Sequence, residues 1–305
     1  MPVVAVINRK GGSGKSTLAT NLAGYCASEG RRVMLGDVDR QQSSLAWLRR
    51  RAALPQDSAA AIAGWAVDPR SVMRPPAGVT HVVLDTPGGL RGFDLARVAM
   101  AADAILMPVC DGAFDRESAA ACHAELMTLP RIATGRCKVA LVGMRIDART
   151  KGASRLGAWA AELGVPYVGS VRESQTYVRS AEQGLTVFDL PPARFGADLA
   201  QWRSILDWLE EAWRDAERLS ARSRAAPETP GPVSVSVSVS APGSPEGRPA
   251  PPAPRAPAPA TAPAPEAARA LATMAALASP PVRAIMPSRP AARLGWLFNV
   301  FRSST

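Results

Sequence analysis

Residues 10–17 read Lys10-Gly11-Gly12-Ser13-Gly14-Lys15-Ser16-Thr17, and this stretch decides the fold. It follows an apolar run at 3–7 that predicts a short buried strand, and a helical pattern continues from Ser16 to Ser28. A glycine-rich loop between a strand and a helix turns backbone N–H groups toward phosphate, and its lysine reaches the outer phosphates. Ser16, at the start of the helix, offers a hydroxyl to Mg²⁺. The sequence therefore predicts a phosphate-binding loop over residues 11–17.

The rest of the first 222 residues alternates between short apolar runs and helical patterns. Strands that are apolar throughout are typical of a parallel sheet covered by helices on both faces. We expect strands at 3–7, 33–35, 79–84, 104–109, 139–142 and 166–168, and helices at 16–28, 43–50, 117–129, 153–163 and 195–219. The predicted fold class is α/β, a doubly wound and mostly parallel sheet of the P-loop NTPase type, in one domain at 1–222.

The composition changes after Arg224 to Pro, Ala, Ser and Gly, which predicts a disordered linker over 223–290. A short amphipathic segment follows at 291–305, where large apolar side chains recur at helical spacing: Leu294, Leu297, Phe298 and Phe301. Such a segment suits three roles that the pattern does not separate: docking on a protein, lying in a membrane interface, or no function at all.

Composition leads us to expect a cytoplasmic protein. It has 305 residues, no apolar run long enough for a membrane span, and four widely spaced cysteines that suggest buried thiols rather than a metal–thiolate site. The formal net charge is +10, and 223–305 contribute half of it with eight Arg against three Glu. This excess gives only weak support to nucleic-acid binding, because many soluble proteins carry as much charge without binding DNA.

The lysine at position 10 makes the loop more specific. Lys-Gly-Gly-Xaa-Gly-Lys-Ser-Thr resembles the deviant Walker A motif of ParA/MinD ATPases, and the resemblance spans about residues 1–210. It implies ATP and Mg²⁺ as cofactors, slow hydrolysis and a homodimer in the ATP state. Lys10 would cross the dimer interface to the partner's phosphates, where its charge offsets that of two facing nucleotides. A solvated loop lysine is the simpler alternative.

Two acidic segments also match the family. Asp37 and Asp39 follow the predicted strand at 33–35, and Asp85 lies within a run, 82–88, that resembles the Walker B strand and its switch loop. The resemblance implies that Asp39 holds the attacking water or the magnesium shell, that Asp37 supports it, and that Asp85 holds Mg²⁺ through water. Aspartates at strand ends are also common helix caps.

Basic residues toward the C-terminal end of the domain complete the predicted sites. By resemblance, Arg145, Arg172 and Glu173 flank the adenine, although Met144 and Arg172 replace residues that relatives often carry there. The candidates for nonspecific DNA binding are Arg172, Arg179, Arg194 and Arg203, which would form one basic face on dimerisation. Scattered solvated arginines remain the alternative for these four.

The resemblance implies an ATPase that partitions or positions DNA or protein cargo. The ATP dimer would bind nonspecific DNA, and an activating partner of ParB type or a cargo adaptor would stimulate hydrolysis, so the protein would be associated with the nucleoid. The alternative is a MinD-like, peripherally membrane-associated ATPase that acts on division or an envelope assembly through the segment at 291–305. A third class, the amidoligases and electron-transfer ATPases of this fold, is less supported, because the sequence has neither a cluster-binding Cys pair nor a second substrate domain.

Overall fold

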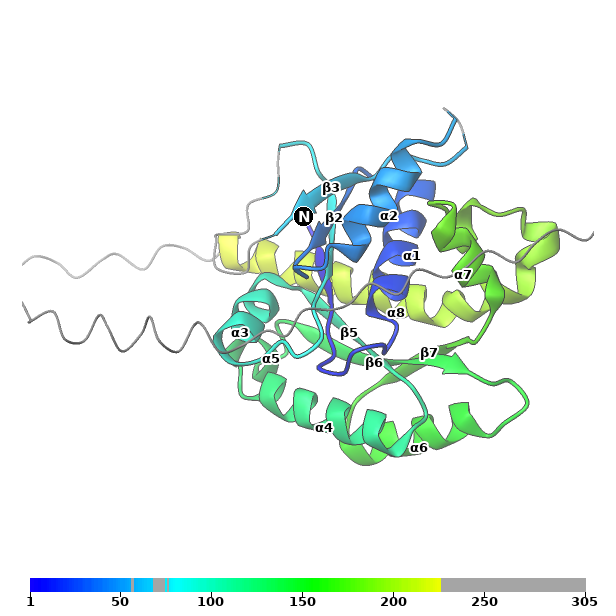
Figure 1. Cartoon of the computed structure of the whole chain (residues 1–305). Coiled ribbons are helices and arrows are strands. Elements are labelled where there is room, and N and C mark those ends of the chain that lie inside the picture. The colour runs from blue at the N-terminus through cyan, green and yellow to red at the C-terminus, as the bar shows by residue number, and fades with distance from the viewer. Residues whose placement is uncertain (56–57, 68–74, 76, 226–305) are drawn as a thin grey trace, which may run out of the picture. The chain divides into compact units, whose positions relative to one another are not determined.

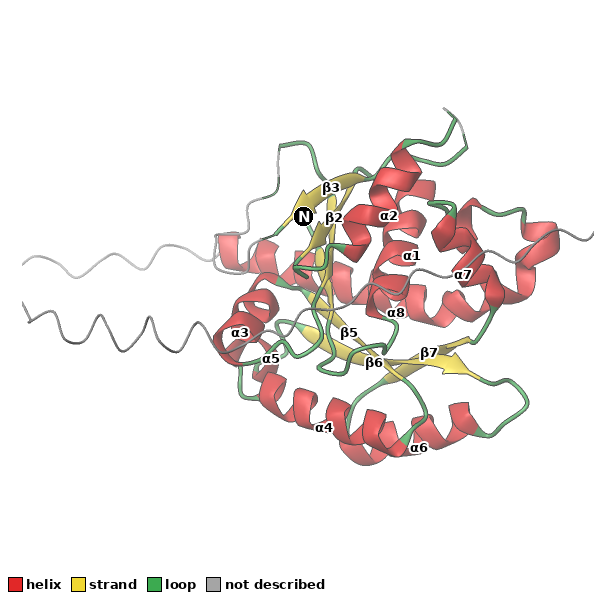
Figure 2. Ribbon diagram, in the orientation of Figure 1, coloured by secondary structure: helices red, strands yellow, loops and turns green. Residues whose placement is uncertain are grey.

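The computed structural model describes residues 1–55, 58–67, 75 and 77–225. Its centre is a seven-stranded parallel sheet in the order β3-β2-β4-β1-β5-β6-β7 (Figures 1 and 2). The strands are β1 (Val3–Val6), β2 (Val33–Asp37), β3 (Ala63–Ala66), β4 (His81–Asp85), β5 (Ala104–Val109), β6 (Lys138–Ile146) and β7 (Tyr167–Arg172). The central strands β1, β2, β4 and β5 are almost entirely buried, as expected for apolar strands in a parallel sheet covered on both faces.

Helices cover both faces of the sheet, as predicted (Figure 1). One face packs against α1 (Lys15–Ser28), α2 (Ser43–Ala52), α7 (Gln175–Glu182) and α8 (Pro192–Ala225). The other packs against α3 (Gly92–Ala101), α4 (Ala113–Met127), α5 (Pro130–Ala133) and α6 (Gly152–Leu163). A 3₁₀ turn, η1 (Val187–Asp189), leads into α8, whose buried Trp202 donates to the Tyr177 hydroxyl at 3.0 Å. The prediction of a doubly wound parallel α/β fold is confirmed.

Several elements differ from the sequence-based expectation. The strand β3 and the helices α3, α5 and α7 were not predicted. β3 is largely exposed at the sheet edge, and α7 is short and polar, so neither carries a clear apolar signal. The helix expected at 117–129 begins earlier, at Ala113, because Gly112 is its N-cap. β7 extends beyond 166–168 to Arg172, which places Arg172 at the end of a strand.

The linker predicted at 223–290 and the amphipathic segment predicted at 291–305 lie almost wholly outside the described residues. Of these two stretches, the structure describes only residues 223–225, at the end of α8. Of the cysteines, Cys26, Cys122 and Cys137 are buried and Cys110 is partly exposed; all four are free thiols. Within the described part of the chain, no helix is both long and apolar enough to cross a membrane.

Candidate nucleotide site

The predicted phosphate-binding loop connects the carboxyl end of β1 to α1. β1 lies between β4 and β5. The chain runs from β1 to β2 on one side of it and crosses from β4 to β5 on the other, so the strand order reverses here, and ligands of open α/β sheets bind at such a point. Gly12 and Gly14 have φ values of 75° and 92°, a left-handed conformation that favours glycine. A Cβ on Gly14 would also lie 2.9 Å from Met144 Cε. The loop therefore needs glycine at these positions both for backbone conformation and, at Gly14, for space.

A cavity of about 380 Å³ opens above this loop. Its lining brings together segments far apart in the sequence: Gly11, Gly12, Gly14, Lys15, Ser16, Thr17, Asp39, Gln41, Ser43, Thr86, Pro87, Gly88 and Arg145. A Cβ built on Gly11 or Gly12 would have no other atom within 4 Å, so the space beside these two glycines is open. Ser13 does not line the cavity; it is 1% exposed and its hydroxyl has no hydrogen-bond partner. All other residues of the predicted loop at 11–17 thus line this one cavity.

Lys15 points back over the loop. Its Nζ donates to the carbonyl oxygen of Lys10 at 2.9 Å, which folds the lysine across the glycines. Burial lowers the pKa of Lys15, while the charges of Asp85 and Asp39 raise it. A buried ammonium near two carboxylates is poised to bind the phosphates of a nucleotide, because bound anions would replace the hydration that it has lost.

Asp85 lies at the carboxyl end of β4, in register with Asp37 of β2. Its Oδ2 accepts a 2.7 Å hydrogen bond from the Ser44 hydroxyl, and its Oδ1 is buried with no partner in the part of the chain that the structure describes. Burial raises the pKa of Asp85 to about 6, although the hydroxyls of Ser44 and Ser16 act to lower it. A buried carboxylate oxygen that has no hydrogen-bond partner among the described residues fits an Mg²⁺ site with oxygen ligands. The residues present therefore fit the ion that the motif implies.

Asp37 and Asp39 have different surroundings, although the sequence put both in catalysis. Asp37 is 2% exposed; its Oδ1 accepts from the backbone of Asp39 at 3.0 Å and its Oδ2 from the backbone of Leu45 at 3.1 Å. Burial raises the pKa of Asp37, opposed by these hydrogen bonds. Asp39 accepts a 3.0 Å bond from the backbone of Gln41 and lines the nucleotide cavity. The structure thus gives Asp37 a part in shaping the loop and gives Asp39 the contact with the cavity.

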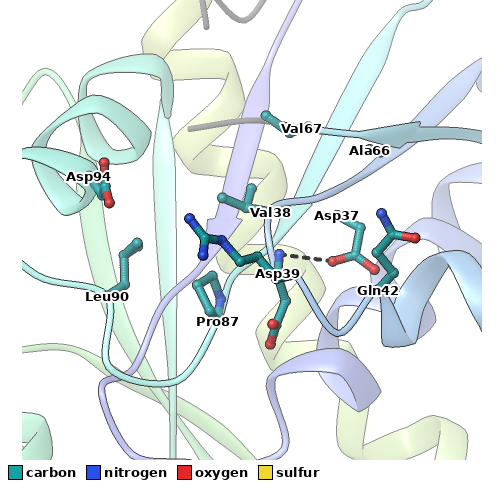
Figure 3. Close-up of a pocket in the computed structure, with 10 residues that line it drawn as sticks. Asp37, Val38, Asp39, Gln42, Ala66, Val67, Pro87, Leu90 and Asp94 are labelled. Carbon is teal, nitrogen blue, oxygen red and sulfur yellow. Dashed lines mark hydrogen bonds between the residues drawn. The ribbon is translucent and has the colours of Figure 1, made fainter. Parts of the chain in front are cut away.

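A second cavity, of about 570 Å³, lies on the other side of Asp39. Figure 3 shows the hydrogen bond between Asp37 and Asp39 and, across the cavity, Leu90 and Asp94. Asp39 and Pro87 line both cavities, so they form the wall between them. The segment of β4 and its switch loop, predicted at 82–88, therefore separates the nucleotide cavity from a second opening toward α3.

Lys10 is held away from the cavity that its own loop encloses. Its Nζ forms an ion pair with Asp115 Oδ2 at 2.7 Å, and Asp115 lies in the first turn of α4. The residues that line the cavity do not include Lys10. Asp115 was missed in the sequence, because 105 residues separate it from Lys10 and no spacing rule connects the two.

The predicted adenine contacts divide between two places. Arg145 lines the nucleotide cavity and has an unusual φ of 55° for a residue other than glycine. Arg172 and Glu173 instead line a separate recess of about 310 Å³ with Asp147, Ala148 and Arg149. The structure therefore brings Arg145, but neither Arg172 nor Glu173, to the cavity above the phosphate-binding loop.

The predicted DNA-binding arginines do not form a uniform set. Arg172 makes two hydrogen bonds to Asp198, at 2.7 and 3.0 Å, and these bonds raise its pKa. The side chain of Asp198 is 3% exposed, so Arg172 serves to neutralise a buried carboxylate. Arg179, Arg194 and Arg203 are exposed on α7 and α8, and Arg194 stacks over the Phe195 ring at 5.6 Å. Among the described residues, Arg172 therefore carries an ion pair with a buried carboxylate, unlike the other three arginines, and its part in a DNA-binding face stays a prediction.

Comparison with known proteins identifies the family. The family model of the CobQ/CobB/MinD/ParA nucleotide binding domain matches residues 4–304. The chain is 32% identical over 217 residues to maintenance of carboxysome distribution protein A from Gloeobacter kilaueensis, which covers 70% of this chain and 95% of that protein. It is 27% identical over 189 residues to the protein of the same name from Halothiobacillus neapolitanus, covering 61% of this chain and 87% of that protein.

Solved structures share the fold. A putative plasmid partition protein from Borrelia burgdorferi bound to AMPPNP superposes with a TM-score of 0.51 at 15% identity, covering 69% of this chain and 99% of that one. The septum site-determining protein MinD from Pyrococcus horikoshii, complexed with Mg-ADP, gives 0.51 at 14% identity, covering 68% and 97%. ATP and Mg²⁺ are the cofactors of ParA/MinD ATPases, and the site described above has the groups to bind both. The chain belongs to the CobQ/CobB/MinD/ParA family of nucleotide-binding domains.

Proposed function

We propose that this protein is a nucleotide-switched ATPase that positions cargo by binding nonspecific DNA as an ATP dimer. The observation that carries the proposal is the placement of Lys10, which lies beside the phosphate-binding loop but outside the residues that line its cavity. A lysine there cannot neutralise its own nucleotide without leaving Asp115. A cation at the rim of the site is suited to reach phosphates from a second copy, so ATP binding and dimerisation would be one event.

Hydrolysis in this site depends on positioning and charge. Mg²⁺, when bound, neutralises charge on the outer phosphates. Lys15 binds those phosphates, Asp39 faces the same cavity and orients the attacking water, and Pro87 and Gly88 border it from the switch loop. A site with one water-orienting carboxylate and no nucleophile is suited to slow turnover, so we expect a stimulating partner that completes the site from outside.

The cargo proposal rests on the relatives. The two carboxysome distribution proteins are named for distributing a protein assembly, and one of them aligns over 95% of its length. We therefore favour a protein assembly as cargo over a DNA locus, reached through an adaptor. The DNA surface is proposed on the exposed Arg179, Arg194 and Arg203, without Arg172. No described residue favours the membrane-cycling alternative, because the segment that would carry it lies outside the described residues.

The test is sedimentation of the purified full-length chain with ATP, Mg²⁺ and nonspecific DNA across a range of salt concentrations. Wild-type protein should bind DNA with ATP but not with ADP, and the affinity should fall steeply as salt rises. Lys10→Ala should bind ATP yet remain a monomer and lose DNA binding. The matched control is Lys151→Ala, since Lys151 is also exposed and lies at the start of α6. Absence of ATP-dependent, salt-sensitive DNA binding would refute the proposal.

A further inference from the structure

Ser44 connects the first turn of α2 to the predicted magnesium ligand. It is 0% exposed, and its hydroxyl donates to Asp85 Oδ2 at 2.7 Å. Asp85 is itself 1% exposed, and its other oxygen, Oδ1, has no hydrogen-bond partner among the described residues. A carboxylate with one oxygen bonded and the other free has a fixed orientation, so the bond from Ser44 determines which oxygen is left for a cation.

Ser44 is in turn held in place from β2. The N-cap of α2, Gln42, has a left-handed φ of 53° and makes no side-chain cap bond. The backbone N–H of Leu45 instead donates to Asp37 Oδ2 at 3.1 Å, so a carboxylate from the neighbouring strand caps the helix. Asp37 and Asp85 are register partners on the adjacent strands β2 and β4. The first turn of α2 therefore contacts both carboxylates, Asp37 through the backbone of Leu45 and Asp85 through the side chain of Ser44.

These contacts form one continuous path. We propose that Ser44 is a positioning residue for Mg²⁺ binding, and that it orients Asp85 so that Oδ1 faces the ion. Asp37 does not contact Asp85 through this path; it holds the first turn of α2, which carries Ser44, and so supports the position of Ser44. The inference rests on the proposed function only in requiring that this site binds Mg²⁺ with a nucleotide.

A purely structural hydrogen bond would have a different signature. Alanine has a higher helix propensity than serine, so Ser44→Ala does not weaken α2 through propensity. If Ser44 only stabilised the fold, its removal would lower nucleotide affinity equally with and without Mg²⁺. If it positions Asp85, only the increase in affinity that Mg²⁺ provides is lost.

The experiment measures binding of a fluorescent ATP analogue to the full chain, once in EDTA and once in excess Mg²⁺. We expect Ser44→Ala to reduce the Mg²⁺-dependent gain in affinity by about 10-fold, and to leave affinity in EDTA unchanged. Ser44→Cys, which keeps a weak donor of similar size, should fall between alanine and wild type, and it serves if the alanine variant does not fold. Ser28→Ala is the matched control, because Ser28 donates to the Tyr25 carbonyl on exposed α1 surface and should match wild type.

The outcomes separate the two ideas. If wild type gains affinity with Mg²⁺ and both Ser44 variants gain as much, the positioning inference is overturned while the proposed function stands. An equal loss in EDTA and in Mg²⁺ also overturns it, since that is the signature of a structural role. If wild type shows no Mg²⁺-dependent nucleotide binding, the proposed function and the inference fall together.

Discussion

The nucleotide edge of the sheet and the arginine-bearing surface of α7 and α8 differ in how they are built. At the nucleotide edge, most of the cavity lining comes from contiguous pieces of chain, above all residues 11–17 and the loop after β4. On the other surface, the arginines come from separate turns, and each has its own environment. Arg172 is bonded to a buried aspartate, whereas Arg179 and Arg203 are exposed. A local motif therefore specifies the first region, and only tertiary contacts define the second.

One helix contacts both regions. Ser44, in the first turn of α2, bonds to Asp85, and in its last turn Arg51 makes two hydrogen bonds to Asp189, both at 2.9 Å, just before α8. Arg51 also donates to the Gly184 carbonyl, and Arg50 to the Ala181 carbonyl at the end of α7. Substitutions along α2 are therefore the sharpest way to test whether the two regions depend on each other.

The largest expected effect is that of Arg51→Met. The side chains of Arg51 and Asp189 are 4% and 5% exposed, so removing the arginine leaves an uncompensated buried carboxylate. We expect a loss of about 3–5 kcal/mol in the free energy of unfolding, measured by urea denaturation. Arg49→Met, at an exposed position two residues earlier in the same helix, should cost less than about 0.5 kcal/mol. Equal costs for the two variants would contradict the role given to this pair.

The next effect, Asp39→Ala, concerns the nucleotide edge alone. Asp39 lines the cavity but its carboxylate contacts only backbone among the bonds seen in the structure, so its loss should leave ATP binding nearly intact. We expect hydrolysis to fall by about 100-fold, measured as phosphate release, with the ATP-bound state prolonged. Lys15→Ala, in contrast, should lose nucleotide affinity itself. A variant that loses binding and turnover in the same proportion would argue against Asp39 as the water-orienting group.

Smaller effects should appear on the arginine-bearing surface. Arg179→Ala and Arg203→Ala should each weaken DNA binding a few-fold and reduce the slope of log affinity against log salt by about 1. Arg172→Ala should instead lower stability, because it leaves the buried Asp198 without its partner. If Arg172→Ala reduces the salt slope while stability is unchanged, the reassignment of Arg172 to a structural role is wrong.

The smallest effect is a pH dependence at the Arg51–Asp189 pair. Burial alone raises the pKa of Asp189, but hydrogen bonds from Arg51 and Thr186 outweigh it and hold the pKa below its usual value. The folded pKa is thus lower than the unfolded pKa of about 3.9, so the stabilisation is present above that pH and is lost as pH falls through the folded pKa. Urea unfolding between about pH 5 and pH 3 should show a steeper loss for wild type than for Asp189→Asn. Parallel curves would mean that the pair does not shift the titration of Asp189.

Sequence alone determined the phosphate-binding loop, the parallel α/β class and the place of Asp39 and Asp85. These follow from contiguous patterns: glycines that a phosphate loop requires, strands that are apolar throughout, and acids directly after strands. β3 and α7 carry no apolar pattern that predicts them, because β3 is largely exposed at the sheet edge and α7 buries only Tyr177 and Ser180.

Only the tertiary structure determined which charged and polar side chains are paired with another residue of the protein. Lys10 meets Asp115 over 105 residues, Arg172 meets Asp198 over 26, and Ser44 meets Asp85 over 41. Nothing in the spacing of these residues marks them as partners, because the sheet order and the helix packing bring them together. The sequence gives the charge of each side chain. Whether that charge binds a ligand or pairs with a buried residue of opposite charge depends on which groups the fold places beside it.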